Sequence, residues 1–247
     1  MGVSKIFKVL IFSTLCIFAI ISAAVDTSVR MSLDYQVISE QNPNKKTILK
    51  SSQSSVRIIS SLHTEDYSGI TSTSSGTYIE HKDLTYILTT AHSIIGHCED
   101  TFAIADELMY QCEEIIILDH DIDMAILQIG VIDGKSPIKI VNNLYPYKEV
   151  RKSILVHNEI IYTGYPQGIG PLTFDGKIVS HPTDIGYVFA HSYAWSGSSG
   201  SGVFDTSGML IGLITAVSVA NSEYGVDVME DLVIITPLSL ADVMRAF

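Results

Sequence analysis

Three short motifs in this 247-residue sequence contain the side-chain types that acyl transfer on a peptide requires. His92 ends the run Thr-Thr-Ala-His, Asp123 begins the run Asp-Met-Ala-Ile-Leu, and Ser199 lies within Gly-Ser-Ser-Gly-Ser-Gly. A serine hydroxyl is a poor nucleophile at neutral pH unless a nearby imidazole takes its proton. A buried carboxylate must then hold that imidazole in the right tautomer. We therefore expect His92 as the general base, Asp123 as its orienting carboxylate and Ser199 as the nucleophile.

Glycine positions select one serine from the four in the third motif. A glycine two positions before the nucleophile and another directly after it let the backbone turn tightly and point N–H groups at a developing oxyanion. Only Ser199 has both, as Gly197 and Gly200. The N–H groups of Gly197 and Ser199 are the expected oxyanion hole, and such donors each contribute about 3–4 kcal/mol. The core-like residues 193–195 and 203–204 on either side argue against a flexible linker. The serines not selected are Ser196, Ser198 and Ser201.

Longer stretches around these motifs resemble trypsin-like peptidases of the compact bacterial, HtrA-like type. Residues 75–77 and 86–92 resemble the family's glycine-led strand and the strand that ends in its histidine. Residues 160–168 with 176–180 are similar to the opening of the second barrel, and 208–216 to the strand beside the substrate cleft. The chain order His, Asp, Ser and the intervals of 31 and 76 residues are those of small members. The resemblance covers about residues 55–247.

The resemblance implies an all-β, chymotrypsin-like fold of two six-stranded antiparallel β-barrels with a short C-terminal helix. It also selects Asp123 over Asp119 and Asp121, because family members place the aspartate directly before x-Ala-aliphatic-aliphatic. Ser198 stands where digestive-type zymogens have an aspartate, so activation by insertion of a new N-terminus is not expected. No PDZ-like segment follows Ser199, so peptide-gated regulation is not expected either.

The resemblance further implies that the primary substrate pocket is uncharged. Its lining is expected from one residue before the nucleophile and from one strand after it: Tyr193, Ile214, Thr215, Ala216, Val217 and Ser218. A pocket without a carboxylate cannot offset the desolvation of a substrate lysine or arginine. We expect cleavage after small or medium uncharged residues.

Composition fits a folded, β-rich protein, and the resemblance implies that its substrates are proteins or peptides. Only 17% of residues are charged, 47% are hydrophobic and 17 residues are glycine. The formal net charge of −12 argues against nucleic-acid binding. No metal and no cofactor are expected. The glycines of 168–170 do not form a dinucleotide fingerprint, because Thr173 stands where the next glycine would be needed.

The N-terminus has the pattern of an export signal. Lys5 and Lys8 precede an apolar run at residues 9–21 and small residues at 22–24. The run is shorter than the roughly 20 residues that span a bilayer. We expect residues 1–24 to be cleaved, the protein to be secreted or periplasmic, and membrane contact to be transient. An uncleaved membrane anchor is the alternative.

Cleavage there removes Cys16 and leaves Cys98 and Cys112, an even pair that favours a disulfide outside the cytoplasm. Closing this loop of about 15 residues would contribute roughly 3 kcal/mol. Two reduced thiols are the alternative. A metal site formed by the two cysteines with His92 and His97 is a less favoured alternative, because His92 already has the expected role of general base.

The rest of the chain divides into three expected parts. Residues 25–54 are polar and read as an extended arm or propeptide, residues 55–141 as the first barrel, and residues 142–247 as the second barrel. A helix over 238–247 is expected to open at Pro237. First-barrel strands are expected at 56–60, 77–80, 85–89, 114–118 and 124–129. Second-barrel strands are expected at 138–141, 159–162, 172–179, 186–191, 202–204, 209–218 and 232–235.

Together these features predict an exported serine endopeptidase. One rival reading is a catalytically silent pseudoprotease that binds peptides or a receptor on the same scaffold. Another is a membrane-tethered envelope protein.

Overall fold

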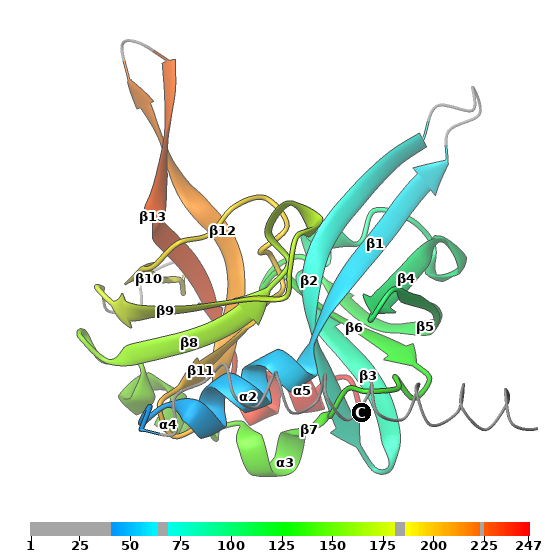
Figure 1. The fold of residues 1–247 in the computed structure, drawn as a ribbon, viewed down its shortest axis with the longest axis horizontal. Coiled ribbons are helices and arrows are strands. Elements are labelled where there is room, and N and C mark those ends of the chain that lie inside the picture. The colour runs from blue at the N-terminus through cyan, green and yellow to red at the C-terminus, as the bar shows by residue number, and fades with distance from the viewer. Residues whose placement is uncertain (1–40, 64–68, 181–185, 223–224) are drawn as a thin grey trace, which may run out of the picture. The chain divides into compact units, whose positions relative to one another are not determined.

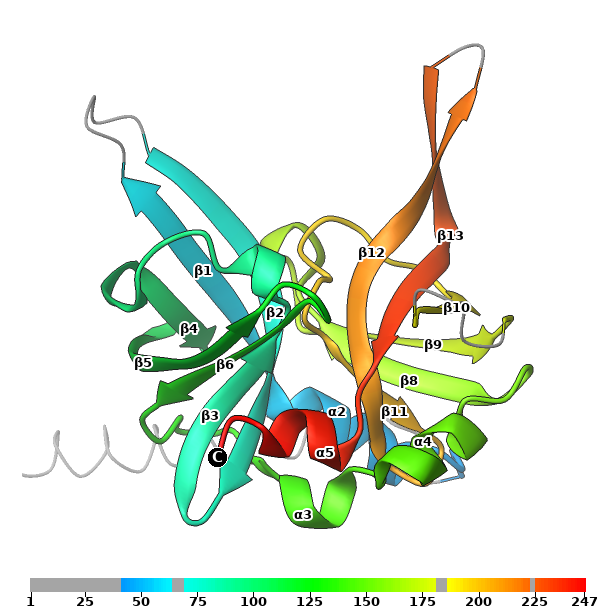
Figure 2. The same ribbon diagram turned by 180° about the vertical axis from the view of Figure 1, so that it is seen from behind.

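Two antiparallel barrels make up most of the described chain (Figures 1 and 2). The computed structural model describes residues 41–63, 69–180, 186–222 and 225–247, and only the backbone at residue 151 and residues 216–230. The chain divides into a short unit, Met1–Lys45, and a large unit, Lys46–Phe247, which contains every described strand. The expected signal segment lies outside the described residues. Among the helices that are described, none is long and apolar enough to cross a membrane.

The first barrel consists of β1 (Ser55–His63), β2 (Gly69–His81), β3 (Leu84–Thr89), β4 (Thr101–Ala105), β5 (Leu108–Asp119) and β6 (Met124–Ile129). Its strand order is β1–β4–β5–β6–β3–β2, and pairing of β2 with β1 closes it. A short strand, β7 (Ile138–Lys139), adds to β2 in parallel.

The second barrel consists of β8 (Glu159–Gly164), β9 (Leu172–Ile178), β10 (Val188–His191), β11 (Gly202–Asp205), β12 (Leu210–Ser222) and β13 (Gly225–Pro237). These strands close in the order β10–β13–β12–β11–β8–β9. The prediction of two six-stranded antiparallel barrels is therefore confirmed.

From Tyr86 to the end of β3, and along most of β6, side chains are buried on both faces of the strand, which explains the apolar runs there. Successive side chains of a strand point to opposite faces. Ile87 and Leu127 belong to the core inside the first barrel. Leu88 and Ile126 belong to a second cluster, which includes Phe204 of the other barrel. The two strands that lead to His92 and follow Asp123 are thereby fixed from both sides.

Helix α2 (Lys45–Ser54) corrects the prediction of an extended arm for its last ten residues. The helix docks through small polar side chains rather than an apolar face. Ser51 Oγ donates to Thr163 Oγ1 at 2.9 Å, and Thr47 Oγ1 donates to the carbonyl of Thr206 at 3.3 Å. Because the buried positions carry serine and threonine, the sequence has no hydrophobic period that would reveal a helix.

The C-terminal helix is present but begins later than predicted. Helix α5 (Leu240–Met244) starts at a capping box, in which Ser239 Oγ accepts from the Asp242 N–H and the Asp242 carboxylate accepts from the Ser239 N–H. Pro237 is the last residue of β13, so the prediction that it opens the helix is wrong. Beyond the helix, Phe247 stacks on His81 with ring centroids 4.5 Å apart.

The strand predictions were right in some places and wrong in others. Residues 124–129 form β6 as predicted. The strand predicted at 138–141 of the second barrel is wrong, because Ile138–Lys139 pairs with β2 of the first barrel and Ile140–Asn143 is helix α3. Strand β4 and helix α4 (Tyr147–Ser153) were not predicted.

Candidate active site

His92 lies where strand β3 ends. The chain passes from Thr89 through Thr90 into a single 3-10 turn, Ala91–Ser93, and Thr90 Oγ1 and Ser93 Oγ share a hydrogen bond of 2.7 Å across it. The imidazole is 49% exposed, so one edge of the ring faces solvent while the other faces Asp123.

Asp123 lies directly before β6, at the same end of the first barrel. The register pairs Thr89 with Ala125, which brings the end of β3 beside the start of β6. Asp123 has a φ of +51°, a left-handed conformation in which aspartate is enriched, and its side chain is only 12% exposed. This backbone geometry aims a nearly buried carboxylate at the turn that contains His92.

Two hydrogen bonds join Asp123 to His92. Asp123 Oδ1 accepts the His92 backbone N–H at 2.9 Å, and Oδ2 lies 2.7 Å from the ring Nδ1. Partial burial raises the pKa of Asp123, but the hydrogen bonds from the His92 ring, its N–H and the Ala91 N–H outweigh that effect, so the pKa lies below its ordinary value. The carboxylate is therefore ionised at neutral pH and can only accept, which makes Nδ1 the donor.

The other two aspartates of this turn have different environments. Asp119 Oδ1 accepts the N–H groups of Asp121 and Ile122 at 3.0 and 3.3 Å, and Oδ2 pairs with Arg245 at 2.6 Å. Asp121 is exposed. Neither carboxylate bonds to His92 in the described part of the chain. The structure thus brings Asp123 to His92 and leaves Asp119 at the end of β5, paired with Arg245.

Ser199 lies in a tight loop that only glycine permits at two points. Gly197 has a φ of +96° and Gly200 a φ of +85°. A Cβ on Gly197 would lie 2.6 Å from the Tyr165 carbonyl oxygen, and one on Gly200 would overlap the Ser75 carbonyl and the Thr89 hydroxyl. Both glycines predicted from the motif are therefore required by conformation and by space.

Two N–H groups of this loop, those of Gly197 and Ser199, have no acceptor among the described residues. The neighbouring N–H groups do donate: Ser198 to the Trp195 carbonyl at 2.9 Å, and Gly200 to the Ile214 carbonyl at 2.8 Å. Both predicted oxyanion-hole donors thus lack a partner among the described residues.

The Ser199 hydroxyl donates to the Thr215 carbonyl at 3.0 Å. Among the described residues it forms no hydrogen bond with His92. The chain segments of the two residues nevertheless meet, since the space at Gly200 is bounded by the Thr89 hydroxyl, three residues before His92. The structure therefore brings Ser199 to the end of β3 without closing the serine–histidine bond.

The predicted pocket residues have different surroundings. Tyr193 is 54% exposed and stacks on Trp195, with ring centroids 6.1 Å apart. Ile214 lies in the second-barrel core, 1% exposed, and Thr215 Oγ1 shares a hydrogen bond of 2.6 Å with Thr236 Oγ1. Ala216, Val217 and Ser218 belong to β12, and their side chains are outside the described part.

The predicted disulfide is present. Cys98 and Cys112 are bonded, with Cα atoms 5.2 Å apart, and the bond joins the 3-10 turn Cys98–Asp100 to β5. Both sulfurs are used in this bond, in place of the alternative of two reduced thiols. In the described ranges there is no group of three or more histidine, cysteine or acidic side chains arranged to hold a metal.

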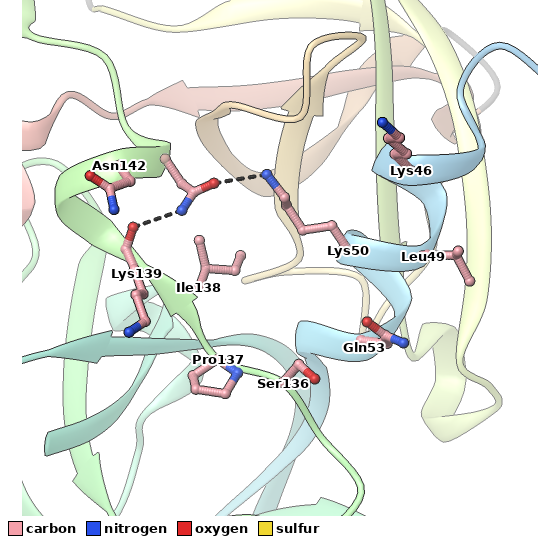
Figure 3. Close-up of a pocket in the computed structure, with 10 residues that line it drawn as sticks. Lys46, Leu49, Lys50, Gln53, Ser136, Pro137, Ile138, Lys139 and Asn142 are labelled. Carbon is pink, nitrogen blue, oxygen red and sulfur yellow. Dashed lines mark hydrogen bonds between the residues drawn. The ribbon is translucent and has the colours of Figure 1, made fainter. Parts of the chain in front are cut away.

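A pocket of about 400 Å³ lies elsewhere, between α2 and residues 136–143 (Figure 3). The Lys50 ammonium group donates to Asn143 Oδ1 and to the Gly208 carbonyl, both at 2.7 Å. Lys139 is paired with Glu80 at 3.3 Å. None of the expected catalytic residues lines this pocket, and these two lysines already have partners, so it is not the catalytic cleft.

Ser75 is a buried contributor to the site that the sequence argument did not identify. Its N–H donates to the Ser199 carbonyl at 2.8 Å and its hydroxyl to the Gly197 carbonyl at 2.7 Å. Its own carbonyl accepts the Thr89 hydroxyl at 2.7 Å. Ser75 is 122 residues from Gly197 in sequence, so no local spacing could indicate this contact.

Proteases are among the solved structures with a similar fold. The serine endoprotease from Yersinia pestis superposes with a TM-score of 0.60 and 20% identity, covering 82% of this chain and 65% of that one. The HtrA-type protease AlgW, solved with a decapeptide, gives 0.62 and 16%, covering 82% and 66%. Rv3671c from M. tuberculosis H37Rv, in an inactive form, gives 0.56 and 14%, covering 84% and 91%. The chain thus spans just under two thirds of the first two, and its fold is the chymotrypsin-like double barrel.

The family model of the trypsin-like peptidase domain matches residues 74–213, more than half of the sequence. The chain therefore belongs to the trypsin-like peptidase family. This confirms the resemblance found in the motifs, and the matched range contains His92, Asp123 and Ser199. Comparison with curated protein sequences gives no significant match.

Proposed function

We propose that this peptidase is an exported serine endopeptidase that cleaves through an acyl-enzyme on Ser199. The observation that carries the proposal is the pair of hydrogen bonds between Asp123 and His92. It is joined by Ser199, which lies between the positive-φ glycines Gly197 and Gly200. The N–H groups of Gly197 and Ser199 have no acceptor among the described residues.

His92 is the base because Asp123 fixes its tautomer. With Nδ1 donating to the ionised carboxylate, the second ring nitrogen, Nε2, is left as an acceptor. In the reaction it takes the Ser199 proton as the hydroxyl oxygen attacks the scissile carbonyl, and it later returns that proton to the leaving amine. Ser199 must first leave the Thr215 carbonyl, which a rotation about χ1 accomplishes.

The N–H groups of Gly197 and Ser199 then donate hydrogen bonds to the oxyanion of the tetrahedral intermediate. Donors that are already in place cost no reorganisation when charge develops, and removal of one typically costs about 10²–10³ in kcat. Water then attacks the acyl-enzyme by the same route and releases the second product.

The exported location rests on two supports. The N-terminal sequence has the basic, apolar and small-residue order of a signal, and the Cys98–Cys112 disulfide suits an oxidising compartment. N-terminal sequencing of secreted or periplasmic protein should find the chain beginning at Val25. An N-terminus at Met1 in membrane fractions would favour the tethered alternative.

One observation favours a second function. The Ser199 hydroxyl donates to the Thr215 carbonyl and not to His92, so the serine is not hydrogen-bonded to its proposed base. A catalytically silent pseudoprotease that only binds peptides would have the same arrangement. A fluorophosphonate probe decides between the two, because it labels only a serine activated by its base.

The decisive experiment combines that probe with hydrolysis of internally quenched peptides. The wild type and Ser198→Ala should be labelled and active, with the label on Ser199 by peptide mass spectrometry. Ser198 is a matched control because it lies in the same loop, is 1% exposed and accepts only the Trp195 N–H. Ser199→Ala should lose both labelling and hydrolysis. Hydrolysis that survives Ser199→Ala would contradict the proposal, and peptide binding without labelling would establish the pseudoprotease.

A further inference from the structure

We infer that two buried serines, Ser75 and Ser201, are positioning residues that hold the oxyanion hole in its receptive form. The inference rests on the proposed function and deepens it. Both side chains are completely buried, and neither has a role in the His–Asp–Ser chemistry. Each hydroxyl donates to a carbonyl of the loop that ends at Ser199.

The planarity of the peptide bond couples the direction of each oxyanion donor to that of the carbonyl in the same peptide. In a trans peptide the carbonyl and the N–H of the next residue point in opposite directions, so a partner that fixes one also fixes the other. The Gly197 N–H shares its peptide with the Ser196 carbonyl, and the Ser199 N–H shares its peptide with the Ser198 carbonyl. The direction of each oxyanion donor is therefore set on the opposite side of its peptide.

Ser201 sets the Ser199 donor. The Ser198 carbonyl accepts the Ser201 hydroxyl at 2.7 Å and the Ser201 N–H at 3.1 Å. These two bonds turn the Ser198 oxygen into the protein and hence the Ser199 N–H outward. The hydroxyl makes the shorter of the two bonds.

Ser75 sets the peptide between the two donors. Its hydroxyl donates to the Gly197 carbonyl at 2.7 Å and accepts the Tyr165 N–H at 2.8 Å. On the preceding peptide, the Ser196 carbonyl accepts the Gln167 N–H at 2.6 Å, which directs the Gly197 N–H away from residue 167. Ser75 thereby links the Gly197 carbonyl to the segment Tyr165–Gln167, which also orients the Gly197 N–H through the Ser196 carbonyl.

Gly164 provides the space for both hydroxyls. A Cβ at this position would overlap Ser201 Oγ and lie 2.9 Å from Ser75 Oγ. The glycine at the end of β8 is thus explained by the two serines rather than by its own backbone conformation. Gly164→Ala is a third way to disturb the same pair.

The test compares site variants with matched controls in the full-length protein. The site variants are Ser75→Ala and Ser201→Ala. The control for Ser75 is Ser55→Ala, because Ser55 is also a buried first-barrel serine that donates to a second-barrel carbonyl, that of Thr163 at 2.9 Å. The control for Ser201 is Ser192→Ala, whose hydroxyl donates to the Asp175 carbonyl at 2.8 Å.

Three quantities are measured: kcat and KM on one internally quenched peptide with a neutral residue before the cleaved bond, and Ki for a peptide aldehyde of the same sequence. The aldehyde forms a tetrahedral adduct whose oxygen occupies the oxyanion hole. Misplaced donors weaken both the transition state and this adduct, so kcat should fall and Ki should rise by about 10-fold each, with KM within 2-fold of wild type. Ser201→Ala should be the milder change, because the Ser201 N–H still holds the Ser198 carbonyl.

Thermal melting separates positioning from folding. The controls should lose comparable thermal stability while retaining kcat and Ki. Should Ser75→Ala fail to fold, Ser201→Ala and Gly164→Ala test the inference through the same pair. Site variants that match their controls in kcat and Ki overturn the inference and leave the proposed function intact. A wild type that neither hydrolyses peptides nor reacts with a fluorophosphonate overturns both.

Discussion

Asp123→Asn is the most informative single substitution, because both oxygens of this carboxylate accept hydrogen bonds and an amide has only one oxygen. Asp123 Oδ1 accepts the His92 backbone N–H at 2.9 Å and Oδ2 faces Nδ1 at 2.7 Å, so both oxygens face groups that donate. An asparagine has one oxygen and one NH₂ group. Whichever way it turns, one of the two positions receives a donor.

The ring can adapt to a donor, whereas the backbone N–H cannot. The amide should therefore keep its oxygen on the backbone N–H and present NH₂ to Nδ1. The imidazole then moves its proton to Nε2, the atom that must accept the proton of Ser199. The base is blocked without any change of shape, and kcat/KM should fall by roughly 10⁴. At 1.36 kcal/mol per tenfold change this is about 5 kcal/mol of lost transition-state stabilisation.

The assay is kcat/KM for an internally quenched peptide, with thermal melting to show that the variant is folded. Asp121→Asn is the control, since Asp121 is an exposed carboxylate two residues away and should retain nearly full activity. The reasoning is refuted when Asp123→Asn stays within tenfold of wild type, or when Asp121→Asn proves as damaging.

Three further predictions follow from other parts of the molecule. Burial raises the pKa of Asp119, but the Arg245 hydrogen bond, the two N–H groups of its turn and the charge of Arg245 outweigh it, so the pKa is lowered. A lowered folded-state pKa contributes stability above the unfolded value of about 3.9 and loses it as pH falls through the lower folded value. Arg245→Ala should therefore lower the free energy of unfolding by about 0.2–1 kcal/mol at pH 7. The difference in melting temperature between the variant and the wild type should vanish on titration below about pH 4. A difference that stays constant with pH would contradict this. Replacing Cys98 and Cys112 together by serine should cost about 3 kcal/mol in the free energy of unfolding, which urea titration measures, and no loss would show that the bridge does not restrain the unfolded chain. Profiling with a peptide library should show cleavage after Ala, Val, Leu or Met, because Tyr193 and the β12 strand provide no charge, and a dominant preference for Arg, Lys or Glu would overturn the pocket assignment.

The parts of this structure that were predictable from sequence are those with a local signal. The sequence predicts the strand Met124–Ile129 to the residue, because five of its six side chains are apolar and an aspartate-rich segment precedes it. The glycines around Ser199 were identified from spacing alone, and the positive φ of Gly197 and Gly200 gives the physical reason. These signals come from neighbours in sequence, where conformation and side-chain type are directly linked.

The failures have one common cause, which is that the deciding partner lies far away in sequence. The short run at 138–141 is apolar enough for a strand, but nothing within it says that Ile138–Lys139 pairs with β2 rather than with the second barrel. Helix α2 is held by hydroxyl contacts such as Ser51 to Thr163, 112 residues apart. A serine-rich segment gives the same sequence pattern whether it docks or stays extended.

The same reasoning explains why the nucleophile was predictable and its support was not. Ser199 is marked by glycines that any chain with this loop must have, whereas Ser75 is an ordinary serine until the barrels meet. The cluster that joins the barrels contains Leu88, one residue before the end of β3, and Leu213, two residues before Thr215. Packing between the barrels therefore fixes the strands that lead to His92 and Thr215. The hydrogen bonds of Ser75 then fix the loop of Gly197 and Ser199 relative to those strands. The site is accordingly a property of the seam between the barrels, and we expect its geometry to be lost before either barrel loses its own core.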